Sequence, residues 1–475
     1  MSPSLARKAD APPAEELVGR LVGRARAAMK GYARADQDLV DDAVRGIAWA
    51  LYEPARAREL AELAVADTGL GNVEDKVAKN RRKTFGTLRD LLRVRTVGVI
   101  EENPAKGIVK IAKPVGVVGA ITPSTNPAAT PVNKAMMALK GRNAIVIAPS
   151  PAGFSTTAKS VAYMRAELEK IGLPEDLVQV LPQPIDRART GALMAAVDLV
   201  VCTGSQSNVR QAYSSGTPAI GVGTGNVPVI VDTSADLADA AAKIARSKCF
   251  DNATSCSSEN ALVILDEVYD GALRALGDAG GHLASPDERA RIEAALFRGG
   301  RLNRELVARD AAVLAQRVGL AEDAWKASFF MVEEKGIGPD HPFSGEKLSL
   351  VLAVYRARSF AQAKSICARI LDHQGRGHSV GIHTREPAHA RELADELDVV
   401  RVLVNQAHTF GNGGGFDNGL PFTLSMGCGT WGGNSIAENL SWRHFINLTH
   451  LVTTIAEDRP AEDELFGTYW QRYGR

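Results

Sequence analysis

The sequence VGVVGAIT at Val115–Thr122 is apolar at nearly every position and predicts a strand that is buried on both faces. Helical stretches, such as 156–171, separate most of the similar runs that follow at 143–148 (NAIVIA), 177–181 (LVQVL), 199–203 (LVVCT) and 227–231 (VPVIV). Apolar strands that alternate with helices predict a parallel sheet covered on both faces. The sequence therefore predicts an α/β fold whose first domain is a Rossmann-type nucleotide domain.

The rest of the chain adds helices, a second α/β region and an arm. Helices are expected at 15–32, 36–69 and 74–92, and further strands at 261–265, 348–355 and 400–404. Residues 107–113 (GIVKIAK) alternate like an exposed strand, which favours an arm that pairs with a second copy of the chain. The expected divisions are a disordered tail at 1–14, a nucleotide-binding domain at 15–237 with an arm strand near 93–113, a catalytic domain at 238–425, and a return segment with an oligomerisation tail at 426–475.

Composition narrows the classes of partner. The 56 basic and 55 acidic residues nearly cancel and form no long basic stripe, which argues against nucleic acid. No apolar run reaches the roughly 20 residues of a membrane span, and residues 1–14 lack a secretory pattern. The cysteines are odd in number and scattered, and neither CxxC nor HExxH occurs, so we expect reduced thiols, no metal site and a cytoplasmic protein. The amphipathic helix at 15–32 is expected to pack on the core; docking into a microcompartment shell is the alternative.

The segment FDNATSCSSEN, from Phe250 to Asn260, is the strongest chemical signal. Cys256 lies in a polar loop between a predicted helix and the apolar strand ALVIL, and small neighbours such as Ser257 would leave its thiol reachable. A thiolate is a good nucleophile toward an aldehyde carbon. An inert loop cysteine is the alternative interpretation. Cys428, in GCGTWGG, is held as a rival nucleophile.

A second signal is ITPSTNPAATP, from Ile121 to Pro131, which follows the first core strand directly. Asn126 lies among prolines that stiffen the loop. An amide N–H held there could stabilise the oxyanion that forms when a thiolate attacks a carbonyl. A turn asparagine is the alternative.

Glycines mark a third segment, PAIGVGTGNVPVIV at Pro218–Val231. Gly221, Gly223 and Gly225 would let the backbone approach a cofactor closely, although a tight turn explains them equally well. Gly204 and Ser205 follow the strand LVVCT, where their backbone N–H groups could face a pyrophosphate at a helix start.

Together these segments resemble the CoA-acylating branch of the aldehyde dehydrogenase superfamily, from about residue 107 to residue 450. The matching segments are TPSTNP with Asn126, the loop 221–226, the segment around Cys256, GEKLSLVLAVYR with Glu346, and 418–435. The resemblance implies that Cys256 is the nucleophile, Asn126 the oxyanion donor, and Glu346 the residue that holds the nicotinamide ribose. It also implies NAD(P) contacts at Thr122, Pro123, Ser150, Gly204, Ser205, Gly221, Gly223 and Gly225.

Two departures from the hydrolytic relatives are informative. No acidic residue occurs between Gly216 and Val231, where those relatives carry the base that activates the deacylating water. A thioester at Cys256 would then last long enough to meet coenzyme A. The segment Ala148–Pro151 (APSP) lacks the family's usual lysine and has no acid to repel a 2′-phosphate, so NADP is somewhat favoured over NAD. A hydrolytic enzyme, an acyl-phosphate reductase and a non-catalytic shell-docking protein remain as alternatives.

Within this branch, ATSCSSEN at 253–260 and ELFGTYW at 464–470 resemble the acylating sulfoacetaldehyde dehydrogenases. The resemblance implies a short, anionic aldehyde; acetaldehyde and succinate semialdehyde are the alternatives. A sulfonate needs several hydrogen-bond donors or an arginine. The candidate donors are Arg443, Thr125, Thr254 and Ser255. The arm strand and the tail predict a homodimer or homotetramer.

Overall fold

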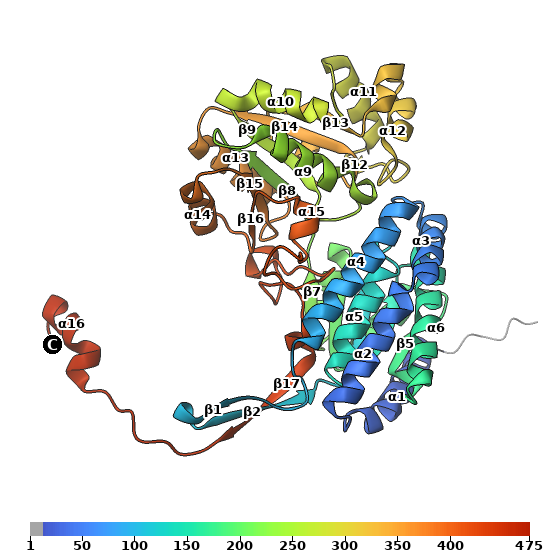
Figure 1. The fold of residues 1–475 in the computed structure, drawn as a ribbon, viewed down its shortest axis with the longest axis vertical. Helices are drawn as coiled ribbons and strands as arrows, with labels where there is room; N and C mark the ends of the chain where they lie inside the picture. Colours follow the sequence, from blue (N-terminus) through green and yellow to red (C-terminus); the bar gives the residue numbers. More distant parts are fainter. Residues whose placement is uncertain (1–12) are drawn as a thin grey trace, which may run out of the picture.

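The computed structural model describes residues 13–475, so the predicted tail at 1–14 lies outside the described residues except for Pro13 and Ala14. Two α/β bodies and a projecting arm make up the chain (Figure 1). None of the helices in the described part of the chain combines the length and the apolarity that a membrane crossing would require.

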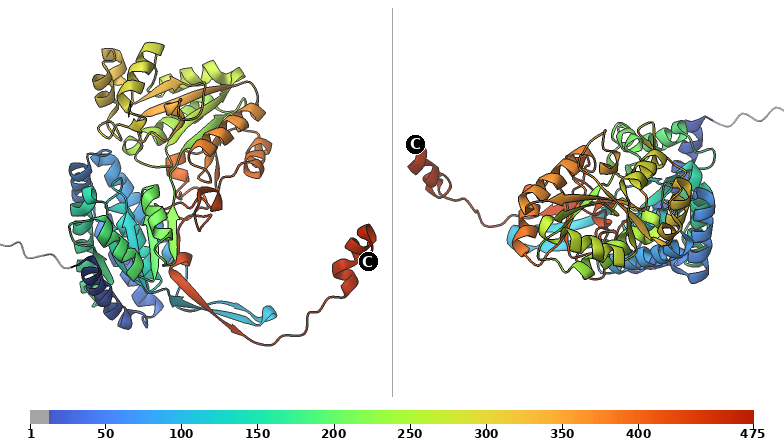
Figure 2. Two further views of the ribbon diagram at one scale, coloured as in Figure 1. Left: turned by 180° about the vertical axis from the view of Figure 1, so that it is seen from behind. Right: turned by 90° about the horizontal axis from the view of Figure 1, so that it is seen from above.

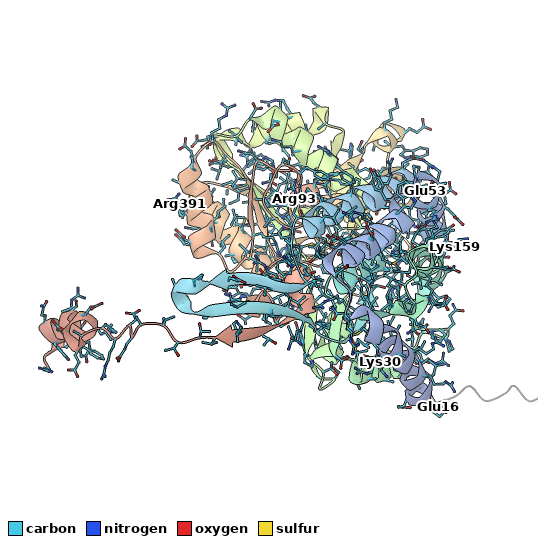
Figure 3. The ribbon with its side chains drawn as sticks, turned by 60° about the horizontal axis from the view of Figure 1, so that its bottom comes forward. Glu16, Lys30, Glu53, Arg93, Lys159 and Arg391 are labelled. Carbon is cyan, nitrogen blue, oxygen red and sulfur yellow. The ribbon has the colours of Figure 1, made fainter. Side chains whose placement is uncertain are left out.

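Four helices precede the first sheet: α1 (Ala14–Tyr32), α2 (Gln37–Tyr52), α3 (Pro54–Thr68) and α4 (Val73–Leu92). The helix expected over 36–69 is interrupted at Glu53, because Pro54 starts a new helix and the Glu53 carboxylate caps it. Helix α1 buries Val18, Leu21 and Val22 against the first body, so it is a core helix rather than a free docking helix. Figure 3 marks its two ends with Glu16 and Lys30.

The first sheet is parallel, in the order β5-β4-β3-β6-β7. Its strands are β3 (Val117–Thr122), β4 (Ala144–Pro149), β5 (Val178–Val180), β6 (Leu199–Thr203) and β7 (Ala219–Val222). The helices that connect them are α5 (Ala129–Lys140), α6 (Phe154–Lys170), α7 (Arg187–Ala196) and α8 (Gln206–Tyr213). Every residue of β3 and β4 is buried, as their apolar sequences predict. Buried Lys134 donates to the carbonyls of Ile121 (3.0 Å) and Val201 (2.8 Å), tying together the carboxyl ends of β3 and β6.

The second sheet has seven strands in the order β10-β13-β14-β9-β8-β15-β16. These are β8 (Val227–Val231), β9 (Glu259–Leu265), β10 (Gly281–Leu283), β13 (Phe329–Glu333), β14 (Val351–Ala357), β15 (Val380–His383) and β16 (Val402–Val404). Its helices are α9 (Leu237–Cys249), α10 (Tyr269–Asp278), α11 (Pro286–Leu296), α12 (Ala311–Val318), α13 (Phe360–His373) and α14 (Pro387–Glu396). The small hairpin β11 (Phe297–Arg298) and β12 (Arg301–Leu302) and the short helix α15 (His408–Gly411) complete this body.

One strand lies in a different sheet from the one predicted. Val227–Val231 forms β8, which pairs with β9 and β15 in the second sheet. The chain therefore changes sheet at residues 223–226, ahead of the boundary predicted at residue 237. An apolar run reports burial on both faces, but it carries no information about which sheet supplies the neighbours.

The arm is an antiparallel sheet in the order β1-β2-β17, formed by β1 (Gly98–Asn103), β2 (Ile108–Pro114) and β17 (Ile446–Val452). A last helix, α16 (Glu462–Tyr473), follows it and has no buried residue. Both views in Figure 2 show α16 standing apart from the rest of the chain. Strand β17 is the outer edge of this sheet and is almost wholly exposed, which leaves its backbone and its apolar side chains open to a partner.

Candidate active site

A cavity of about 700 Å³ lies where the first sheet meets the loops of the second body. Its wall combines the carboxyl ends of first-sheet strands with helix α4 and the loop that carries Cys256. Carboxyl ends of parallel strands share one edge of a sheet, which is where α/β proteins bind ligands. The cavity brings together most of the predicted site residues: Thr122, Pro123, Thr125, Asn126, Ser150, Gly204, Ser205, Gly223, Thr254, Ser255, Cys256 and Glu346.

An unusual backbone run places Cys256. Asp251, Asn252 and Ala253 have φ values of 50°, 52° and 59°, so three consecutive residues other than glycine adopt the left-handed conformation. Such conformations persist only where surrounding contacts hold them. Here Asn252 donates to the Asp310 carboxylate (2.8 Å), and the Asp251 N–H donates to the Asp75 carboxylate (2.7 Å). The cysteine that follows sits in a tight turn before β9 begins.

The Asp251 carboxylate is the centre of a buried ion cluster. It accepts hydrogen bonds from Lys76 (3.0 Å), Lys79, the Thr254 hydroxyl (2.7 Å) and the Asn72 N–H (3.0 Å). Burial alone would raise the pKa of Asp251, and the charges of Lys79 and Lys76 hold it below its ordinary value. Sequence reasoning missed both lysines, because their partner lies some 175 positions away in the chain.

Lys79 also orients Asn126. Its ammonium donates to the Asn126 Oδ1 at 2.9 Å, which fixes the carbonyl end of the amide against α4. The amide nitrogen makes one long contact to the Thr125 hydroxyl (3.4 Å). One amide N–H is thus left without a partner among the described residues, as a donor to a developing oxyanion requires.

Two acidic groups, the Cys256 thiol and the Glu346 carboxyl, line the cavity wall. Burial, then the neighbouring Glu346 carboxylate and Cys428, raise the pKa of the Cys256 thiol to about 12. Burial raises the pKa of Glu346 to about 8, against a hydrogen bond from the Gly225 N–H that lowers it. In the absence of ligands the thiol is therefore protonated at neutral pH, and Glu346 opposes its ionisation when it is itself charged.

Gly225 and Gly221 have packing roles instead of the predicted cofactor contacts. A β-carbon on Gly225 would lie 2.0 Å from the Cys256 carbonyl oxygen and 2.9 Å from the Cys256 β-carbon, so only glycine lets this turn close. A β-carbon on Gly221 would lie 2.6 Å from Val209, because α8 packs directly on β7 there. Neither residue lines the cavity, whereas Gly223 does.

Two further sequence predictions do not match the structure. Arg443 is exposed on a short helical turn at Trp442–Phe445, where its guanidinium lies 5.5 Å from the Trp442 ring. That turn packs on α5 at the base of the arm, so Arg443 does not reach the cavity. Cys428, the rival nucleophile, is a buried residue of the loop 426–434; its N–H donates to the Asn434 side-chain oxygen (2.9 Å), and it does not line the cavity either. Among the described cysteines, Cys256 alone does.

The other end of the cavity suits a dinucleotide. The hydroxyls of Thr122 and Thr130 are buried in its wall and have no hydrogen-bond partner among residues 13–475. Helix α8 begins at the cavity, and the Ser205 side chain caps it by accepting from the Asn208 N–H (3.3 Å). A helix N-terminus with free N–H groups favours a phosphate. Within residues 13–475 no group of three or more histidine, cysteine or acidic side chains is placed to hold a metal ion.

Replacement of Glu346 by glutamine is expected to make Cys256 more reactive above pH 8. Ionised Glu346 disfavours the thiolate, so Glu346→Gln lowers the pKa of the thiol. Because burial is the larger cause, that pKa stays above the ordinary value of about 8.5. The rate of Cys256 alkylation by iodoacetamide, followed by mass spectrometry from pH 6 to pH 10, measures the effect.

The exposed residue Glu267 provides the control, since Glu267→Gln removes the same charge far from the cavity. We expect the two variants and the unmodified protein to react alike below pH 8, where Glu346 is protonated. An alkylation profile that Glu346→Gln leaves unmoved above pH 8 would refute this electrostatic coupling.

Comparison with known proteins agrees with this geometry. Residues 9–291 match the model of the aldehyde dehydrogenase family. The chain is 55% identical to a sulfoacetaldehyde dehydrogenase (acylating) of Cupriavidus necator, over 97% of this chain and 94% of that protein, and 42% identical to one of Bilophila wadsworthia, over 96% and 98%. An acetylating aldehyde dehydrogenase structure from Geobacillus thermoglucosidasius superposes with a TM-score of 0.90 at 34% identity, covering 94% of this chain and 98% of that chain. The chain belongs to the aldehyde dehydrogenase family.

Proposed function

We propose that this protein oxidises sulfoacetaldehyde with NAD(P)+ and transfers the resulting sulfoacetyl group to coenzyme A. The observation that carries the proposal is a cavity that Cys256 and the amide of Asn126 both line. Among the described residues, the only acidic side chains that line this cavity are Glu346 and Asp186. The acylating sulfoacetaldehyde dehydrogenases to which the chain is similar support the choice of substrate and acceptor.

The reaction begins at the sulfur of Cys256. The Cys256 thiol, which is protonated in the ligand-free protein, releases its proton to solvent as the aldehyde binds. The sulfur attacks the aldehyde carbon, and the carbonyl oxygen becomes an oxyanion within a thiohemiacetal. The free N–H of Asn126 stabilises that charge, since Lys79 holds the other end of the amide. NAD(P)+, which Thr122, Ser205 and Glu346 would hold, would supply the hydride acceptor, and loss of the hydride from the former aldehyde carbon would leave a thioester on Cys256.

The acyl group of the thioester then passes to coenzyme A. The thiolate of coenzyme A attacks the acyl carbon, the bond to Cys256 breaks, and the sulfur of Cys256 leaves as a thiolate. Gly225 packs against Cys256, and the segment 223–226 around it reads Gly, Thr, Gly and Asn, which supplies no carboxylate to activate water there. Hydrolysis therefore lacks a base on this side of the sulfur.

The cofactor end of the cavity favours NADP. Ser150 follows β4 where an acid would repel a 2′-phosphate, and its hydroxyl faces the Gly153 N–H (3.3 Å). Asp186 and Arg187 both line the cavity at this end, so their charges offset each other and Arg187 is the side chain that could meet a phosphate. The residues that would hold the dinucleotide are Thr122, Pro123, Ser150, Gly204, Ser205, Gly223 and Glu346.

Product formation is expected to depend on coenzyme A. Without it, sulfoacetaldehyde and NADP+ should yield about one equivalent of reduced cofactor per active site and leave an acyl adduct on Cys256, because the thioester cannot turn over. Addition of coenzyme A should start steady turnover, and Cys256→Ala should abolish both phases. Absorbance of the reduced cofactor and intact-protein mass spectrometry measure these results. Steady formation of sulfoacetate without coenzyme A would contradict the proposal.

Gly225→Ala is expected to lower kcat/KM by about 10²-fold, because the added methyl displaces the backbone of Cys256 and a shift of about 1 Å at a reacting atom has that effect. Steady-state kinetics with a melting curve test this. Gly277→Ala, on the open surface of α10, is the matched control and should behave as the unmodified protein. Equal loss of activity in both variants, or none in Gly225→Ala, would show that the contact does not position the sulfur.

We further infer a homodimer or homotetramer built through the arm. Leu451 and Val452 on β17 are 54% and 65% exposed, and Ile455, in the segment after the strand, is 46% exposed. Apolar side chains exposed on an unpaired edge strand are typical of an interface.

Introducing charge on the arm should dissociate the assembly. The double variant Leu451→Asp with Ile455→Asp buries two carboxylates in the proposed interface, so we expect a monomer in light scattering coupled to gel filtration. Val313→Asp, an exposed apolar-to-acid change on α12, is the control and should leave the mass unchanged. An unmodified protein that is already monomeric would rule the interface out.

A further inference from the structure

Three cations on one face of helix α4 line the catalytic half of the cavity. Lys79, Arg82 and Lys83 are spaced i, i+3 and i+4, which places them on one side of a helix. Asp251 neutralises part of the Lys76–Lys79 pair, as described above. Arg82 and Lys83 have no carboxylate within ion-pair distance in the described part of the chain.

Lys83 is a buried amine whose hydrogen-bond partners are neutral. It donates to the carbonyls of Gly413 (2.7 Å) and Thr423 (3.2 Å), and it lies 5.5 Å from the centre of the Phe422 ring. An ammonium has three N–H donors, so one remains for a further acceptor. Burial, then the charges of Arg82 and Lys79, lower the pKa of Lys83 to about 7, while Cys256 acts in the opposite direction. A buried cation of this kind lacks a counter-charge.

Arg82 stands beside it in an aromatic surround. Its guanidinium lies 5.2 Å from the Phe410 ring and 5.2 Å from the Phe422 ring, and it donates to the Phe410 carbonyl (3.1 Å). The acidic residue that acts on it is Asp417, which is exposed and forms no ion pair with it. A guanidinium has five N–H donors in a fork that matches an anion with several oxygens.

We propose that Arg82 and Lys83 bind the negatively charged end of the substrate and thereby set the preference for an anionic aldehyde. The inference rests on the proposed function and deepens it, since it names the residues that recognise the sulfonate in place of Arg443. The substrate anion supplies the counter-charge that Arg82 and Lys83 do not receive from a carboxylate of the described residues. With the anion held on α4, the aldehyde carbon is directed to the thiol of Cys256, which lines the same cavity as Arg82 and Lys83.

The test compares two aldehydes that differ in charge. We expect Arg82→Gln and Lys83→Met each to lower the ratio of kcat/KM for sulfoacetaldehyde to kcat/KM for propionaldehyde by about 10- to 100-fold, the factor typical of one lost charge-assisted hydrogen bond. Methionine keeps the apolar stem of Lys83 over Phe422. Should Lys83→Met fail to fold, as a melting curve would reveal, the half-buried Arg82 still provides the test.

A binding measurement gives a readout besides turnover. Ethanesulfonate, a sulfonate without an aldehyde, should slow iodoacetamide alkylation of Cys256 in the unmodified protein and lose that effect in Arg82→Gln. The control is Arg81→Gln, which removes the same charge from the opposite face of α4, where Arg81 lies 4.8 Å from the Tyr52 ring. It should retain both the aldehyde preference and the protection by ethanesulfonate.

The possible failures are distinct. If the unmodified protein forms no sulfoacetyl-CoA, the proposed function is wrong. If it does, but Arg82→Gln and Lys83→Met reduce turnover of both aldehydes by one common factor and keep the protection, the two residues support the fold only and the recognition of the anion by α4 is disproved.

Discussion

The buried cluster around Asp251 is the contact on which the site depends. One carboxylate joins Lys76 and Lys79 on α4 to Thr254 in the loop that leads to Cys256, and Lys79 extends the cluster to Asn126. Cys256 and Asn126, the proposed nucleophile and oxyanion donor, come from different bodies of the chain, and this cluster fixes the position of one relative to the other. Removal of one member of such a buried pair typically costs about 3–5 kcal/mol, because the partner is left charged and dry.

Close backbone packing supplies the second constraint. Gly225 lies against Cys256 with no room for a side chain, at the point where the chain leaves the first sheet for the second. The crossover therefore does two things at once: it carries the chain between the two sheets, and it supports the turn that presents the sulfur. The same crossover holds no carboxylate, so the segment nearest the thioester offers steric support and no base.

The charged side chains of the cavity are distributed unevenly between its two ends. The thiol end carries Lys79, Arg82 and Lys83 against the single carboxyl of Glu346, whose own pKa is raised to about 8. Asp251 pairs with Lys79, so the proposed binding mode has an anionic aldehyde supply the counter-ion that Arg82 and Lys83 lack. In that proposal helix α4 serves both substrate preference and the placement of Asn126, because Lys79 holds Asn126 from the same face.

The sequence by itself determined the α/β class and the arm strand, and it predicted one site for Cys256 and Asn126, which the structure places in the same cavity. Apolar periodicity and local turn chemistry allow this because they are properties of neighbouring residues. The sequence also identified the absence of an acid at 216–231. Only the tertiary structure assigned β8 to the second sheet, made Gly225 a support for Cys256, removed Arg443 from the site and brought α4 to it. The physical reason is distance along the chain: Lys79 and Asp251 are 172 positions apart, and only folding turns that separation into a hydrogen bond.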